Sequence, residues 1–443
     1  MKISLSDSFS YGKLLRFTIP SIAMMIFTSI YGVVDGFFVS NFVGKTPFAA
    51  VNFIMPLLMI LGTIGFMFGT GGNALVSLTM GEGDKERANK IFSLIVYVSL
   101  ILGVIIGALG VIFIRQIASF LGAEGQMLED SVLYGRIILL ALPAFILQME
   151  FQSFFVTAEK PQLGLFVTVA AGVTNMILDY LLVGVIPLGL VGAATATAIS
   201  QCIGGFVPLI YFASKNSSLL RLGKTNFDGR ALFKTCTNGS SELMSNISMS
   251  VVGMLYNTQL YDIAGEDGVA AYGVMMYVSM IFCGAFIGYT VGVAPVIGYH
   301  YGAANIGELK SLLRKSVVIV SSFSVCMVAL AFVLAAPLSK LFVGYDEVLF
   351  EMTRNGFFIF SLSFLFMGFA IFGSGFFTAL NDGLTSAAIS FLRTLVFQIA
   401  AVLILPIMFG LDGIWWSLVV AEAMAVAVWL IFLIIKRRKY NYF

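Results

Sequence analysis

The chain has 443 residues, of which 59% are hydrophobic and 11% are charged, and its formal net charge is +2. A soluble globular domain carries roughly 25% charged residues, so this composition excludes an ordinary water-soluble fold. The charge pattern also excludes a nucleic-acid-binding surface, because no basic stripe runs through the sequence.

Apolar runs follow one another along almost the whole chain. A membrane helix needs about 20 mainly apolar residues, and a helix is the only practical structure for this pattern because lipid offers backbone groups no hydrogen-bond partners. The sequence therefore predicts an all-α integral membrane protein with twelve transmembrane helices. The predicted spans are 14–40, 50–79, 91–114, 132–157, 163–186, 189–212, 236–262, 268–298, 313–336, 352–380, 384–409 and 412–435.

The distribution of Lys and Arg predicts how these spans are oriented. If the N-terminus is cytoplasmic, 19 of the 25 basic residues lie on the cytoplasmic side and Arg393 lies inside a span. Cytoplasmic segments of membrane proteins carry this excess of basic residues. We therefore expect a multi-pass protein of the inner (plasma) membrane with both termini in the cytoplasm. The five basic residues on the opposite side are Lys45, Arg115, Arg136, Lys340 and Arg354.

The two halves of the chain are related by one ungapped shift of 221 residues. The shift places Gly44 on Gly265, and it places the string Gly189-Leu190-Val191-Gly192 on Gly410-Leu411-Asp412-Gly413. Because it crosses six spans, both halves point the same way through the membrane, as in transporters built from parallel repeats. The sequence predicts two pseudo-twofold-related six-helix lobes that face each other across a cleft. We expect an N-lobe at 1–212, a cytoplasmic linker at 213–235 and a C-lobe at 236–443.

Four oxygen-bearing side chains are predicted to lie at one depth in the outer half of the N-lobe. Asp35 lies late in span 1, and Asn175 and Asp179 lie past the middle of span 5, where their spacing of four residues puts them on one helix face. Thr197 lies early in span 6. Such hard oxygen ligands suit a small cation such as Na⁺, and two neighbouring carboxylates also suit a proton.

The C-lobe does not repeat this set. The positions that match the four residues are Tyr256, Val396, Ala400 and Leu418. If the set served folding alone, both halves of a duplicated fold would be expected to keep it, so we interpret it as functional. The alternative is a set of hydrogen bonds that holds neighbouring helices together.

Other ionisable residues also lie within the spans. Arg393 in span 11 and Glu422 in span 12 lie near mid-depth on neighbouring helices, which predicts a buried structural ion pair. Glu150, with Gln148 beside it in span 4, and Glu242 in span 7 could attract a cationic substrate. The alternative for both glutamates is a solvated helix end or a structural pair.

The chain resembles the multidrug and toxic compound extrusion (MATE) family, particularly its prokaryotic drug-efflux members. The resemblance covers essentially the whole chain. It implies that Asp35, Asn175, Asp179 and Thr197 form an N-lobe site for H⁺ or Na⁺, and that bending of the first helix involves Pro20. It rests on the two six-helix halves, Val34-Asp35-Gly36, Asn175-x3-Asp179, Thr197, Pro20, Gly192-Ala193 and Gly302-Ala303.

One feature departs from the family pattern. Some members carry an acidic residue in span 10 that acts with the glutamate of span 7, whereas this span reads Gly368-Phe369-Ala370-Ile371-Phe372-Gly373. The absence of an acid there argues against a second cation site in the C-lobe and weakens the transfer of a role to Glu242.

Three functions are compatible with these observations to different degrees. The favoured one is an H⁺- or Na⁺-coupled antiporter that exports small amphipathic, often cationic, organic compounds through the bilayer, acting as a monomer. A lipid-linked oligosaccharide flippase would need several basic residues in the cleft, and only Arg393 lies at mid-depth. An intramembrane enzyme would need a nucleophile–base pair or a metal set, which the sequence lacks, and the absence of a Walker motif predicts no nucleotide and no cofactor.

Overall fold

The computed structural model describes residues 3–43 and 45–442. Four residues lie outside the described ranges. They include Gly44, which was used above for the repeat, and Lys2, which was counted among the cytoplasmic basic residues. The other two are the first residue of the predicted N-lobe and the last residue of the predicted C-lobe. The described chain is helical almost throughout, and π-helical turns occur at three places. In chain order, the elements are α1 (Tyr11–Phe38), η1 (Val39–Val43), α2 (Lys45–Gly81), α3 (Lys85–Phe120), α4 (Gly125–Leu140), α5 (Leu142–Thr157), α6 (Pro161–Asp179), η2 (Tyr180–Val185), α7 (Gly189–Ala213), α8 (Gly229–Gly302), α9 (Ile306–Val343), α10 (Glu347–Ser361), α11 (Phe364–Ala379), α12 (Gly383–Phe391), η3 (Leu392–Val396) and α13 (Phe397–Tyr440).

Among the described residues, these elements give the twelve predicted spans. Eight helices are long and apolar enough to cross a membrane, and two bent pairs, α4 with α5 and α10 with α11, bring the number to ten. Two of the eight are double spans. The backbone of α8 is non-helical at Gly265 (φ 62°), and that of α13 is non-helical at Gly410 (φ 58°), so the chain turns back at each of these glycines. Left-handed φ values are cheap only for glycine.

Two spans are bent, which the sequence interpretation did not anticipate. The axis turns by 57° between α4 and α5 and by 45° between α10 and α11. Pro143 lies in the first turn of α5, where it cannot donate the hydrogen bond that would continue α4. The two bends lie in corresponding spans of the two halves.

The predicted repeat is visible in the helix boundaries. α3 begins at Lys85 and α9 begins at Ile306, 221 residues later. The preceding residues, Asp84 and Asn305, cap their helices in the same way, each accepting a hydrogen bond from the backbone N–H three residues on. The predicted linker 213–235 overlaps the start of α8, which begins at Gly229.

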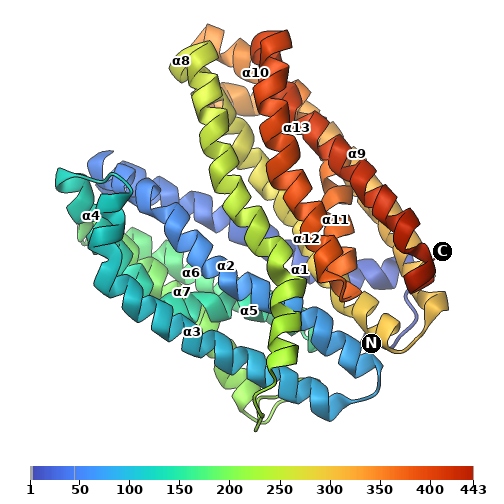
Figure 1. The fold of residues 1–443 in the computed structure, drawn as a ribbon. Helices are drawn as coiled ribbons and strands as arrows, with labels where there is room; N and C mark the ends of the chain where they lie inside the picture. Colours follow the sequence, from blue (N-terminus) through green and yellow to red (C-terminus); the bar gives the residue numbers. More distant parts are fainter. Residues whose placement is uncertain (1–2, 44, 443) are drawn as a thin grey trace.

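The two lobes form a V (Figure 1). They lie together at the end that carries both termini, the terminal face, and they diverge toward the opposite end, the distal face, where α4 and α10 lie on separate arms. Glycines allow backbone contact between the lobes near the terminal face. A Cβ on Gly81 would lie 2.0 Å from the Tyr299 oxygen, and one on Gly302 would lie 2.1 Å from the Leu78 oxygen. These two contacts are related by the repeat, so the interface is itself pseudo-symmetric.

Candidate cation site

The last turns of α1 and the first half of α7 bring Asp35 and Thr197 together. The Thr197 hydroxyl donates to the Asp35 carboxylate, with 3.3 Å between Oγ1 and Oδ1. Both side chains are half-buried. α1 is followed at once by the π-helical turn η1, and irregular turns of this kind are frequent at functional sites in helices.

α6 places the two remaining predicted residues beside this pair. Asn175 and Asp179 lie one turn apart on α6, and Asp179 ends the helix where η2 begins. Both side chains lie within interacting distance of the Asp35 carboxyl. The structure therefore gathers all four residues, from three separated helices, into one cluster of side chains in the N-lobe, which we call the pocket.

The polar atoms of this pocket are incompletely paired. Asn175 is 1% exposed and Asp179 is 0% exposed. Among the residues that the structure describes, neither amide atom of Asn175 and neither carboxylate oxygen of Asp179 makes a hydrogen bond of normal geometry, although both side chains lie close to the Asp35 carboxyl. Burying a carboxylate without compensation is costly. The donor set of two carboxylates, an amide oxygen and a hydroxyl fits a proton or a small hard cation, which would supply that compensation.

Tyr134 also belongs to the pocket, although the sequence interpretation did not include it. Its hydroxyl is buried, and its side chain lies beside Thr197 and close enough to Asp35 and Asp179 for electrostatic interaction. In the sequence it is one aromatic residue in an apolar run, and the repeat gives no hint of its role. Tyr31 is a second tyrosine near Asp35. It lies four residues before Asp35 on α1, so helical spacing alone could have placed the two side chains on the same helix face.

The corresponding region of the C-lobe holds a different arrangement. Arg393 in η3 and Glu422 in α13 form the predicted ion pair, with the guanidinium Nε 2.8 Å and 3.0 Å from the two carboxylate oxygens. Nη2 of Arg393 donates a third bond at 2.9 Å. The pair lies within electrostatic range of Glu242. The guanidinium thus places a built-in positive charge among the C-lobe carboxylates.

The residues predicted to contact a substrate do not share one surface. Glu150 is completely buried between α5 and α3, where the Ser99 hydroxyl donates to it, and its other oxygen has no hydrogen-bond partner in the described structure. Gln148 faces elsewhere, toward Gly204 of α7 and toward Tyr31. Glu242 is half-buried in the C-lobe.

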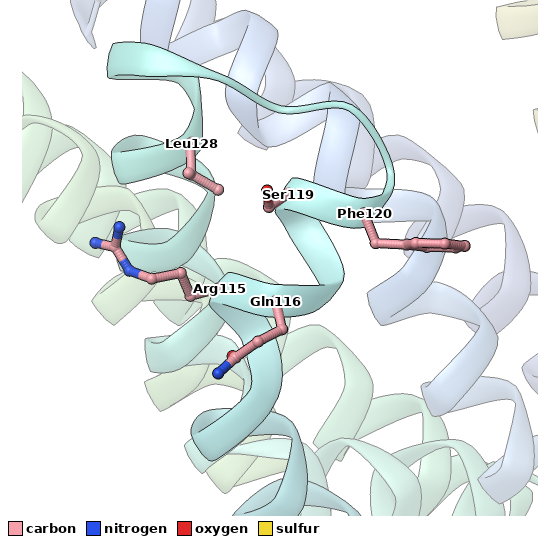
Figure 2. Close-up of a pocket in the computed structure, with 5 residues that line it drawn as sticks. All are labelled: Arg115, Gln116, Ser119, Phe120 and Leu128. Atoms are coloured by element: carbon pink, nitrogen blue, oxygen red, sulfur yellow. The ribbon is translucent and has the colours of Figure 1, made fainter.

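Pro20 and the surface hollows complete the survey of predicted features. Pro20 is buried within α1, which remains one continuous helix from Tyr11 to Phe38. A shallow hollow lies at the distal ends of α3 and α4 (Figure 2), and it includes none of the predicted site residues. Its lining consists of Arg115, Gln116, Ser119, Phe120 and Leu128.

Comparisons with known proteins agree with this architecture. The family model described as MatE matches residues 20–181 and again residues 243–404, one match in each lobe. The chain is 27% identical over 434 residues to "Multidrug export protein MepA" of Staphylococcus saprophyticus, covering 96% of this chain and 94% of the relative. It is also 27% identical over 432 residues to the protein of that name from Staphylococcus aureus strain N315, covering 96% and 94%.

Solved structures show the same fold. "Outward-facing conformation of a multidrug resistance MATE family transporter of the MOP superfamily" matches with a TM-score of 0.92 at 22% identity, covering 98% of both chains. "Crystal structure of MATE in complex with MaL6" matches with a TM-score of 0.93 at 22% identity and the same coverage. The named relatives are export proteins, which leaves the flippase interpretation without support. The chain therefore belongs to the MatE family, the multidrug and toxic compound extrusion transporters.

Proposed function

We propose that the protein is an antiporter that exports amphipathic, often cationic, organic compounds in exchange for H⁺ or Na⁺. The observation that carries the proposal is the cluster of Asp35, Asn175, Asp179 and Thr197, two of them fully buried, which the matching positions of the C-lobe sequence do not repeat. A fold held together by these groups alone would not need the two carboxylate oxygens of Asp179, which make no normal hydrogen bond in the described structure. A transported ion would need them.

The pocket suggests how an ion controls the lobes. Two ionised carboxylates in one buried pocket repel each other, and a proton or a sodium ion relieves the repulsion. An ion can bias the lobes only if it binds the two conformations with different affinity. The pocket draws on α1, α6 and α7, so movement of α1 would alter the spacing of its ligands and supply that difference. Pro20 is the proposed point of bending in α1, because it interrupts the backbone hydrogen bonds of the helix.

The remaining assignments follow from this scheme. We place the terminal face in the cytoplasm, in agreement with the excess of Lys and Arg on that side, and the distal face outside the plasma membrane of the cell. Glu242 would attract cationic groups of the substrate, with Glu150 and Gln148 as weaker candidates. The protein would act as a monomer and would use neither a nucleotide nor an organic cofactor.

The proposal predicts drug movement driven by an ion gradient alone. Purified protein reconstituted in vesicles should move tetraphenylphosphonium against its own gradient when a pH gradient or a Na⁺ gradient is imposed. Collapse of that gradient by an ionophore should stop the movement, and vesicles without protein are the control. Movement that persists at the same rate without any ion gradient would contradict the coupling.

A further inference from the structure

A segment before the first helix joins the two lobes at the terminal face. We call residues 3–10 the strap. Sequence position assigns the strap to the N-lobe, yet it also makes hydrogen bonds to α8 and α9 of the C-lobe. Leu5 is 0% exposed and Phe9 is 1% exposed, and both belong to an apolar cluster built mainly from C-lobe residues, which also includes Leu14 and Phe17 of α1.

Polar contacts fix the strap to the C-lobe. The Phe9 backbone N–H donates to Glu308 Oε1 of α9 over 2.9 Å, and Lys315 of α9 donates to the Phe9 carbonyl. Nε2 of His300, the only histidine in the chain, lies 3.2 Å from the Asp7 carbonyl oxygen. These bonds come from the end of α8 and the first turns of α9, so the strap is seated on one rigid part of the C-lobe.

The strap also has a defined shape of its own. Asp7 Oδ2 accepts a bond from the Ser4 backbone N–H at 3.0 Å and pairs with Lys13 Nζ at 2.8 Å. The hydrogen bond from Lys13 lowers the pKa of Asp7. The carboxylate that closes this turn is therefore charged at neutral pH, and the strap presents Ser4 and Leu5 in a fixed position.

The side chain of Glu159 in the N-lobe holds the other end. Glu159, in the turn between α5 and α6, accepts two bonds at the same oxygen. The Ser4 hydroxyl donates over 2.7 Å, and the Leu5 backbone N–H donates over 2.8 Å. Bonds to a charged acceptor are stronger than neutral ones. Glu159 of the N-lobe, the strap and Glu308 of the C-lobe thus form one chain of hydrogen bonds, and separation of the lobes at the terminal face would have to break it.

The other half of the chain carries a related contact. Asn381 lies in the turn between α11 and α12, which corresponds to the turn of Glu159 in the repeat. Its side-chain Nδ2 donates to the Ala74 carbonyl of α2 in the N-lobe over 2.9 Å, and its Oδ1 accepts from Asn238 over 2.6 Å. Both turn residues are non-glycine residues with left-handed φ, 57° for Glu159 and 58° for Asn381. This strained conformation is uncommon outside glycine.

We propose that Glu159 with the strap, and Asn381 with Ala74, form a pair of latches that hold the terminal face closed while the distal face is open. The two latches lie at corresponding turns, and each joins one lobe to the other. The inference rests on the proposed alternating movement of the lobes, but it makes no use of the coupling ion.

The test exploits the left-handed backbone at the two turns. Glu159→Gly and Asn381→Gly remove the latching side chains at positions where glycine adopts the existing φ without strain. Ala304→Gly is the matched control, because Ala304 also has a left-handed φ of 54° and offers no polar side chain. The reporter is Thr235→Cys in a background whose four native cysteines are replaced by alanine. Thr235 is fully buried, and its backbone oxygen lies against Gly71 of the other lobe.

The measurement is the rate at which this cysteine reacts with a bulky maleimide in nanodiscs. When opening is fast compared with labelling, the rate follows the fraction of open molecules. We expect an increase of roughly tenfold for Glu159→Gly, whose bonds involve a charge, and of roughly fivefold for Asn381→Gly. Ala304→Gly should leave the labelling rate unchanged. The melting temperatures of all three variants should equal that of the parent protein.

Unchanged labelling in both latch variants, or an equal increase in Ala304→Gly, would overturn the proposal. So would an increase that accompanies an equal loss of global stability. Because labelling needs neither a drug nor an ion gradient, these outcomes are separate from a failure of the proposed ion coupling.

Discussion

Asp35→Asn is expected to abolish ion-driven drug transport while leaving the protein folded. The amide keeps the shape of the side chain and its contact with Thr197, but it removes one of the two negative charges that face the ion. Removing one charged partner of a buried charge interaction costs about 3–5 kcal/mol, which corresponds to an ion affinity lower by about a hundredfold to a few thousandfold. The rate of tetraphenylphosphonium transport under an imposed gradient measures the effect, and the melting temperature of the purified variant monitors folding.

The matched control is Asp262→Asn. It makes the same chemical change at an exposed acid on the distal part of α8 and should leave transport within about twofold, as surface substitutions commonly do. If Asp35→Asn transports at the parent rate with the same dependence on the gradient, Asp35 does not belong to the coupling site.

Glu422→Gln is expected to destabilise the protein more than the double variant Arg393→Met/Glu422→Gln. The single change leaves the Arg393 guanidinium buried without the carboxylate that accepts three of its bonds. Removing one partner of a buried pair costs about 3–5 kcal/mol, whereas replacing both partners is often close to neutral. The difference in stability between the single and the double variant is measured by thermal unfolding. The readout is the fraction of purified protein that remains monodisperse after heating.

Arg115→Met provides the control for this comparison. Arg115 pairs with Glu129 at 2.6 Å on the exposed surface, and surface pairs contribute about 0–1 kcal/mol. A double variant as unstable as Glu422→Gln would show that the pair stabilises the C-lobe through packing or further contacts rather than through mutual neutralisation.

The sequence was sufficient for the number and order of the spans because lipid imposes one simple rule, a run of apolar residues for each crossing. The repeat was also recoverable, since it needs no gaps, and Gly189 and Gly410 keep the same left-handed turn in both halves. The bends within spans 4 and 10 were not predicted. Each interrupts an apolar run without changing its composition, and Pro143 at the first bend resembles many prolines that leave membrane helices straight.

The candidate site could be assembled from the sequence because its residues are polar groups within apolar helices, where each of them stands out. Tyr134 does not stand out in this way, because an aromatic residue is common in an apolar helix. The strap escaped notice for another reason. A short Ser-rich segment has no periodicity, and its position depends on contacts with residues about 150 and 300 positions away, such as Glu159 and Glu308. Contacts of this range are set by the packing of the lobes and leave no local pattern.

The central claim is that one ion pocket, in the N-lobe alone, couples ion entry to drug export. Its most direct test is to count the H⁺ or Na⁺ that crosses the vesicle membrane for each drug molecule that crosses in the opposite direction. We predict a fixed ratio for the parent and for Arg393→Met/Glu422→Gln, and no drug-triggered ion movement for Asp179→Asn. Drug-triggered ion movement of parental size in Asp179→Asn would contradict the claim.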